Sequence, residues 1–94
     1  MEKIAFKYKR GIRVDYDRQG YIFFLCRRFR TLPQEKRDRI RALCRSAGGE
    51  YAQALFRFVT TSERASKICM EEYISEATLY RYVKRFYEAF PEDL

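Results

Sequence analysis

The sequence predicts a mainly α-helical fold, a compact bundle of about five helices that a β-hairpin could precede. Three observations support this prediction: apolar residues recur every three or four positions over most of residues 17–90, Gly and Pro punctuate these segments, and Phe and Tyr make up 17% of the chain. Ninety-four residues suit one hydrophobic core. We therefore expect residues 1–94 to be a single domain, with a hairpin or arm over 1–16, supporting helices over 17–60 and two C-terminal helices over 61–90.

The N-terminal segment KIAFKYKRGIRVDY (residues 3–16) alternates apolar and polar residues on either side of a break at Lys9, Arg10 and Gly11. This period of two predicts a β-hairpin. An isolated hairpin is marginal in water, so it would pack on the helices or on a second chain. A flexible basic arm is the alternative. One face of the hairpin would be basic and would carry Lys3, Lys7, Lys9 and Arg13.

The first predicted helix runs through GYIFFLCRRFR, residues 20–30. Asp17 precedes it and can cap its first turn. Its core-facing residues follow the spacing of a buried stripe that Phe24 widens. The stripe consists of Ile22, Leu25, Cys26 and Phe29.

The second predicted helix lies in TLPQEKRDRIRALCRSAGG, residues 31–49. Thr31 and Gln34 have the spacing of a capping box, Pro33 suits the first turn, and Gly48 and Gly49 form a stop. Ile40, Leu43, Cys44 and Ala47 would face the core. Arg37, Arg41 and Arg45 recur every four residues on the outside, where they form either a phosphate-facing stripe or a solvated face.

The remaining helices are predicted from EYAQALFRFV and from the segments after it. The first of these places Tyr51, Leu55, Phe58 and Val59 on one face, although its aromatic and β-branched residues leave a strand open. Thr60 or Thr61 would then cap a helix through SERASKICMEEY, with Glu63 returning a capping-box bond to Thr60. The last helix would begin at Ser75 and end before Pro91.

Residues 62–86, SERASKICMEEYISEATLYRYVKRF, fit two helices that cross after a tight turn. Such a pair needs apolar residues at the crossing, a small residue at the close approach and a cap on the second helix. Here Ile68, Ile74 and Leu79 are the apolar residues, Cys69 is the small residue and Ser75 is the cap. With these residues the segment resembles a helix-turn-helix, which implies that the second helix enters the major groove of double-stranded DNA.

The turn departs from that family at one position, because Tyr73 stands where Gly is usual. A non-glycine residue with positive φ costs about 1 kcal/mol, which a packed turn tolerates. The run from Ser75 to Arg81, S-x-x-T-L-x-R, resembles the start of a recognition helix in many bacterial regulators.

The last helix has one apolar and one polar side. Leu79, Tyr82 or Val83, Phe86 and Phe90 would pack inward, and the opposite side would carry Ala77, Tyr80, Arg81, Lys84 and Glu88. Arginine can donate to guanine O6 and N7, and a glutamate such as Glu76 can accept from cytosine N4. An ordinary amphipathic helix is the alternative. The DNA-binding candidates on this helix are Ser75, Glu76, Ala77, Thr78, Tyr80, Arg81, Lys84 and Arg85.

A wider resemblance begins with LPQEKRDRIRALC. Followed by a helix and a C-terminal helix-turn-helix, it looks like the DNA-binding C-terminal region of bacterial sigma factors and of small sigma-like regulators of phages and mobile elements. In that family LPxxxR opens the supporting helix, and Leu32, Pro33 and Arg37 hold those places here. The resemblance does not cover residues 1–30. It implies transcription regulation and leaves RNA polymerase open as a partner.

The charge distribution also indicates a polyanionic partner. The net charge is +7 and the pI is near 9.5. Residues 1–50 carry a net charge of +8 and residues 51–94 a net charge of −1. Because Glu63, Glu71 and Glu72 on or beside the first motif helix would repel phosphate, we expect the hairpin and the Arg37, Arg41 and Arg45 stripe to supply the general attraction.

Composition argues against an enzyme, a metal site and a membrane protein. The chain has no His, so Cys-His and Ser-His-Asp arrangements and the usual zinc patterns are excluded, and we expect no cofactor. Cys26, Cys44 and Cys69 suit buried reduced thiols. The longest apolar run, YIFFLC, is far too short to span a bilayer, and no signal peptide is visible, so we expect a cytoplasmic protein.

Two other readings remain open. The aromatic excess around the last helix (Tyr80, Tyr82, Phe86, Tyr87 and Phe90) would suit a non-catalytic protein-interaction module or accessory subunit, or a homodimer that presents two recognition helices. A basic surface that holds an anionic membrane is the weakest reading, because no basic amphipathic helix with Trp is present.

Overall fold

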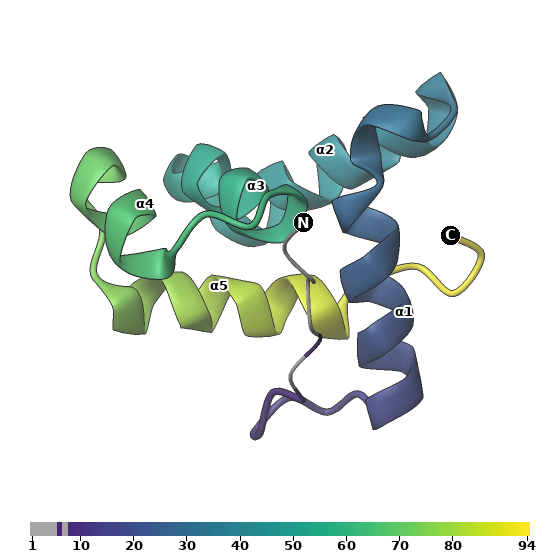
Figure 1. Cartoon of the computed structure of the whole chain (residues 1–94), viewed down its shortest axis with the longest axis horizontal. Helices are drawn as coiled ribbons and strands as arrows, with labels where there is room; N and C mark the ends of the chain where they lie inside the picture. The colour runs from purple at the N-terminus through teal and green to yellow at the C-terminus, as the bar shows by residue number, and fades with distance from the viewer. Residues whose placement is uncertain (1–5, 7) are drawn as a thin grey trace, which may run out of the picture.

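The computed structural model describes residue 6 and residues 8–94, and it is mainly helical. Figure 1 shows α5 along the lower edge, α3 above it, α4 at one end of this pair and α1 at the other. Buried residues from every α-helix contribute to one core cluster. The elements are α1 (Tyr16–Arg27), η1 (Phe29–Thr31), α2 (Gln34–Gly48), η2 (Gly49–Tyr51), α3 (Ala52–Thr60), α4 (Ala65–Glu72) and α5 (Glu76–Glu88).

The predicted β-hairpin is not observed. Residues 1–5 and 7, which cover most of its first strand, lie outside the described residues, and residues 8–15 contain a turn at Arg10 and Gly11 but no strand. The buried side chain of Gln19 makes hydrogen bonds to the backbone of this segment that a second strand would make in a hairpin. Its Oε1 accepts from the Lys9 N–H at 2.9 Å, and its Nε2 donates to the carbonyls of Lys9 and Val14. The segment therefore packs on the helices through a side-chain clamp.

Helix α1 begins earlier than the sequence pattern predicted. Its N-cap is Asp15 rather than Asp17, and the Asp15 carboxylate accepts from the Arg18 N–H at 2.8 Å. The prediction that Phe24 widens the buried stripe is wrong, because Phe24 is 48% exposed whereas its neighbour Phe23 is buried. The other stripe positions are confirmed in the core or packed against it: Ile22, Leu25, Cys26 and Phe29.

Helix α2 begins at Gln34 without the predicted capping box. The Thr31 hydroxyl instead donates backward to the Arg28 carbonyl at 2.8 Å, and the N-cap position is Pro33. The predicted stop is confirmed, because the helix ends at Gly48 and Gly49 follows with φ of 54°. A Cβ at Gly48 would lie 3.2 Å from Leu55, so this glycine allows α2 and α3 to approach closely.

Helix α3 confirms the predicted helix in EYAQALFRFV from Ala52 onward, rather than the strand that was left open, while Glu50 and Tyr51 lie in η2. Leu55 and Val59 are buried, and Tyr51 and Phe58 pack against the core. The three cysteines are free and buried, as predicted. Burial raises the pKa of the Cys26 and Cys44 thiols to about 12, so both remain protonated at neutral pH.

Candidate nucleic-acid interface

Helices α4 and α5 are joined by a short turn over residues 73–75. Tyr73 ends α4 in the left-handed region with φ of 56°, at the position where Gly is usual in the motif it resembles. The Ile74 N–H then donates to the Cys69 carbonyl at 3.1 Å, and this bond closes the turn. The Tyr73 side chain is 91% exposed and contributes little packing to offset the backbone cost.

The start of α4 differs from the prediction. Thr60 and Thr61 do not cap it, because their hydroxyls donate backward to the carbonyls of Phe56 and Arg57, each at 2.6 Å. The helix begins at Ala65, with Arg64 at the N-cap and no side-chain cap. Residues 61–64 therefore form a connection rather than a first helical turn.

The start of α5 confirms the predicted cap. Ser75 is the N-cap, and its Oγ accepts from the Thr78 N–H at 3.1 Å. The hydroxyls of Ser75 and Thr78 also bond to each other at 2.8 Å. The first turn of α5 is therefore closed by two hydrogen bonds of the Ser75 hydroxyl.

The residues of α4 and α5 that face the core are the ones that the sequence predicted. Ile68 and Leu79 are fully buried, and Cys69 and Ile74 are nearly so. Along α5 the apolar side continues through Val83 to Phe86 and on to Phe90 beyond the helix end, all of them buried. The orientation of α5 about its own axis is thereby fixed.

The outward side of α5 carries most of the predicted DNA-binding residues. Arg81, Lys84 and Arg85 are exposed, and none of them forms an ion pair within the part of the chain that the structure describes. Glu76 and Ala77 are exposed in the first turn, whereas Thr78 is half-buried. With Glu88, which is exposed in the last turn, this side carries three cations and two carboxylates.

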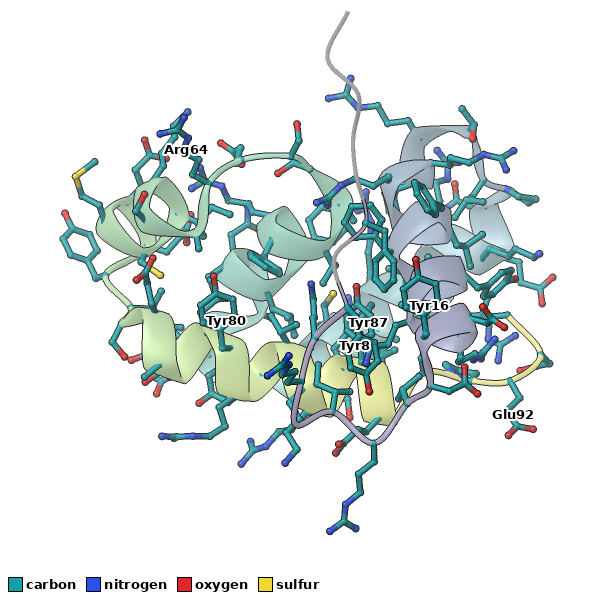
Figure 2. All side chains as sticks on the ribbon, turned by 60° about the horizontal axis from the view of Figure 1, so that its bottom comes forward. Tyr8, Tyr16, Arg64, Tyr80, Tyr87 and Glu92 are labelled. Carbon is teal, nitrogen blue, oxygen red and sulfur yellow. The ribbon has the colours of Figure 1, made fainter. Side chains whose placement is uncertain are left out.

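Tyr80 lies in the middle of that side and is labelled in Figure 2. Its ring meets the Phe58 ring edge to face, with the centroids 5.7 Å apart, and about half of its surface is exposed. Partial burial raises the pKa of Tyr80, and Glu76 and Cys69 raise it further. The hydroxyl therefore remains a hydrogen-bond donor at neutral pH.

The N-terminal segment reaches the C-terminal end of α5, a contact that sequence reasoning missed. The Arg13 N–H donates to Glu88 Oε2 at 2.8 Å. The Lys9 ammonium lies 5.6 Å from the centroid of the Tyr87 ring, and burial lowers the pKa of Lys9. Figure 2 shows Tyr8, Tyr16 and Tyr87 grouped where this segment passes α1 and α5. The turn therefore brings the exposed Arg10 and Arg13 to that end of α5.

The acidic residues around α4 are held by Arg57 on α3, which sequence reasoning also missed. Its guanidinium lies 2.8 Å from Glu63, 2.7 Å from Glu71 and 2.9 Å from Glu72. Hydrogen bonds from Arg57 lower the pKa of Glu63 to about 2, and Lys67 lies 3.5 Å from the same carboxylate. The carboxylates that were expected to repel phosphate are thus partly neutralised within the protein.

The Arg37, Arg41 and Arg45 stripe lies in a different place from the α5 surface. Arg37 is half-buried, and Arg41 and Arg45 are exposed. Arg37 and Arg41 line one hollow, Arg41 and Arg45 line a second one, and no residue of α5 lines either. The structure therefore does not join the two predicted sets of DNA-binding residues in one site.

Most aromatic residues of the last helix are used within this chain. Phe86, Tyr87 and Phe90 are buried, and the rings of Tyr87 and Phe90 each lie within 6.0 Å of Phe86. Tyr82 is half-buried and pairs with Tyr51. Only Tyr80 among the aromatic residues of α5 is exposed, so the aromatic excess is mainly core material.

No helix in the described residues is long and apolar enough to cross a membrane. Over the same residues, no three or more His, Cys, Asp or Glu side chains are grouped so that they could hold a metal ion. The chain matches no protein-family model, no curated protein and no solved structure. The case for function therefore depends on the geometry of the surface residues.

Proposed function

We propose that this protein is a sequence-specific double-stranded DNA-binding protein, a small transcription regulator that reads the major groove with α5. One observation carries the proposal: α5 exposes Arg81, Lys84 and Arg85, which have no carboxylate partner among the described residues, directly after a capped N-terminus that presents the small residue Ala77. A helix that enters the major groove needs small residues at its start and free donors beyond them.

The roles of the α5 side chains follow from their positions. Arg81, one turn beyond Ala77, is the candidate for a bidentate contact to guanine, and Glu76 is the candidate acceptor for cytosine. Lys84 and Arg85 lie farther along the helix and are candidates for phosphate contacts. Ser75 and Thr78 would give up the bond between their hydroxyls to reach the DNA backbone.

Two features outside α5 support the proposal. The N-terminal segment, which turns at Arg10 and Gly11, adds the cations Arg10 and Arg13 next to the C-terminal end of the helix, where they can contact flanking phosphates. Arg57 holds Glu63, Glu71 and Glu72 and so reduces the negative charge that α4 would present to DNA. These contacts offset the excess of acidic over basic side chains in residues 51–94, which would otherwise weaken binding to DNA.

The first test is fluorescence anisotropy of a labelled random duplex at two salt concentrations. Arg81→Ala/Lys84→Ala is compared with the matched control Arg30→Ala/Arg45→Ala, which removes two exposed arginines away from α5. We expect the α5 variant to bind more weakly and, for the one phosphate contact assigned to Lys84, to reduce the salt slope by about 0.9. Equal losses in both variants would indicate general attraction without a reading helix.

Specificity requires a second measurement, because random duplex reports mainly on phosphate contacts. Wild-type protein is used to select bound sequences from a randomised duplex library, and the selection is repeated with Arg81→Ala. We expect wild type to enrich a motif and the variant to relax one or two positions of it. Selection without any enriched motif would contradict sequence-specific binding.

A further inference from the structure

The surface between α2, α3 and the end of α1 is hollowed into a continuous basic groove. A hollow of ≈ 730 Å³ and one of ≈ 300 Å³ share Arg41 and Phe56 in their walls, so the two lie side by side. The α2 wall and the α1 end are basic, and the α3 wall is neutral. The arginines of this basic groove are Arg27, Arg28, Arg30, Arg37, Arg41 and Arg45.

No carboxylate lines the basic groove or pairs with its arginines within the described part of the chain. Arg27 donates to the carbonyls of Phe58 and Val59, and Arg37 donates to the Gln34 amide oxygen. The Nε atoms of Arg27 and Arg37 are buried and have no hydrogen-bond partner among the described residues. Guanidinium groups gathered in this way repel one another, and an anion that binds among them relieves the repulsion.

The basic groove faces away from α5. Phe58 on α3 pairs with Tyr80 of α5, and Tyr51 at the end of η2 pairs with Tyr82, whereas Phe56 lines the groove. At 3.6 residues per turn, Phe56 lies about 160° around α3 from Phe58. Helix α5 therefore covers one side of α3 and the groove lies near the other, as the position of α5 below α3 in Figure 1 also indicates.

The shape of the groove favours a chain of charges over a compact anion. Arg37, Arg41 and Arg45 succeed one another along α2 at intervals of about 6 Å, since four helical residues rise by that distance. Hollows of a few hundred Å³ admit ligand-sized groups, such as nucleotides of one strand, but not a duplex. Donors in a row inside a narrow groove are suited to a single polynucleotide backbone.

Arg41 adds a surface on which bases can stack. Its guanidinium carbon lies 5.2 Å from the centroid of the Phe29 ring and 5.5 Å from that of Phe56. The two rings pack against the guanidinium, and Arg41 as a whole remains exposed. Nucleobases stack on guanidinium planes as well as on aromatic rings in single-strand complexes.

We propose that the basic groove binds a single polynucleotide strand, with its arginines on consecutive phosphates and Arg41 stacked against a base. This site is additional to the duplex-reading side of α5 and does not depend on it. A protein with both sites would hold duplex and single-stranded nucleic acid at the same time on different faces.

The test uses the whole chain, a labelled oligothymidylate of roughly ten nucleotides and the labelled random duplex, both in fluorescence anisotropy. Arg30→Gln/Arg45→Gln removes one exposed arginine from each hollow, and neither side chain has a hydrogen-bond partner in the described structure. The matched control Arg81→Gln/Lys84→Gln changes the net charge equally on α5. Circular dichroism verifies that each variant is folded.

We expect the groove variant to bind the single strand roughly tenfold more weakly, with a salt slope reduced by about 1.4, and the α5 variant to keep the affinity of wild type. Equal losses of strand binding in the two variants, or no strand binding by wild type at low salt, would overturn the inference. Failure of α5 to bind duplex would contradict the proposed function only, because the strand measurement is separate.

Two further comparisons separate a strand from a compact phosphate ligand. Each single variant, Arg30→Gln and Arg45→Gln, is expected to weaken strand binding, because a strand passes through both hollows. An effect of Arg30→Gln alone would place the ligand in the larger hollow and overturn the continuous path. Inorganic tripolyphosphate is expected to compete only at far higher concentration than unlabelled oligothymidylate; equal potency would assign the site to a small polyphosphate and overturn the proposal.

Discussion

Arg57 and the arginines of the basic groove have the same side chain and opposite surroundings. Arg57 meets Glu63, Glu71 and Glu72 within 2.9 Å, whereas no arginine of the basic groove has a carboxylate partner in the described structure. Arg57 makes four hydrogen bonds to carboxylates, and an arginine paired in this way fixes the fold. Arginines whose donors remain free are available to a ligand, and they reduce stability while no ligand is bound.

The two sets are coupled through the connection between α3 and α4. Glu63, held by Arg57, donates its N–H to the Thr61 hydroxyl at 3.2 Å, and Thr61 and Ser62 line the larger hollow. The Thr61 hydroxyl in turn donates to the Arg57 carbonyl at 2.6 Å. The position of this wall of the basic groove therefore depends on the arginine that is paired.

The largest expected effect is that of Arg57→Met. It removes the partner of three carboxylates that are then left to repel one another, and it releases the connection between α3 and α4. We expect the thermal unfolding midpoint, followed by circular dichroism, to fall by several degrees and strand binding to weaken with it. Arg45→Met, at an exposed position that has no ion pair in the part of the chain the structure describes, is the control and is expected to leave the midpoint nearly unchanged. A stable Arg57→Met protein would show that the carboxylates need no common partner.

A smaller effect is expected from pH. Because the pKa of Glu63 is lowered to about 2 in the folded protein, its pairing stabilises the fold above the ordinary carboxyl pKa near 4.5 and is lost as the pH falls toward 2. Urea unfolding of wild type should therefore require less denaturant at each step below pH 4.5. The stability of Glu63→Gln should fall less than that of wild type below pH 4.5. If the two proteins lose stability equally, carboxylates other than Glu63 cause the loss.

Regular periodicity predicted the helices well. The stop at Gly48, the cap at Ser75 and the buried side of α5 are all confirmed, because each depends on residues within one or two turns of one another. The N-terminal alternation indicated a strand, but Gln19 supplies hydrogen bonds to this segment that no local pattern reveals. Threonines at candidate caps were misassigned since a hydroxyl can bond backward to a carbonyl as readily as forward to an N–H.

The candidate surfaces were predictable to different degrees. The outward residues of α5 follow from the sequence because one helix carries them all. The Arg57 cluster joins positions 6, 14 and 15 residues apart, separations at which two residues of one helix do not touch, so helical periodicity does not reveal it. The basic groove combines α2 with residues from α1, η1 and α3, so its sequence signal was limited to Arg37, Arg41 and Arg45.

The two sets of arginines are not wholly separate, because Arg41 belongs to the basic groove and also packs on Phe29 and Phe56. We expect Arg41→Gln to lower the free energy of unfolding by about 1 kcal/mol through the lost cation–π contacts and stem packing. Urea denaturation measures this loss, and Arg45→Gln, one turn farther along α2 and without a ring contact, is the matched control. If both variants have the same free energy of unfolding, the contacts of Arg41 with the two rings do not stabilise the fold.

The smallest expected effect is a gain in stability. Arg45 follows Arg41 by one helical turn, and like charges at this spacing destabilise a helix by roughly 0.2–0.5 kcal/mol. Arg30→Gln/Arg45→Gln should therefore raise the free energy of unfolding by about 0.5 kcal/mol near 0.01 M salt, and the gain should disappear near 1 M salt, where charges are screened within a few ångströms. Urea denaturation at both salt concentrations measures it. A loss of stability at low salt would show that these two arginines contribute to the fold as Arg57 does, and the contrast between paired and free arginines would not hold.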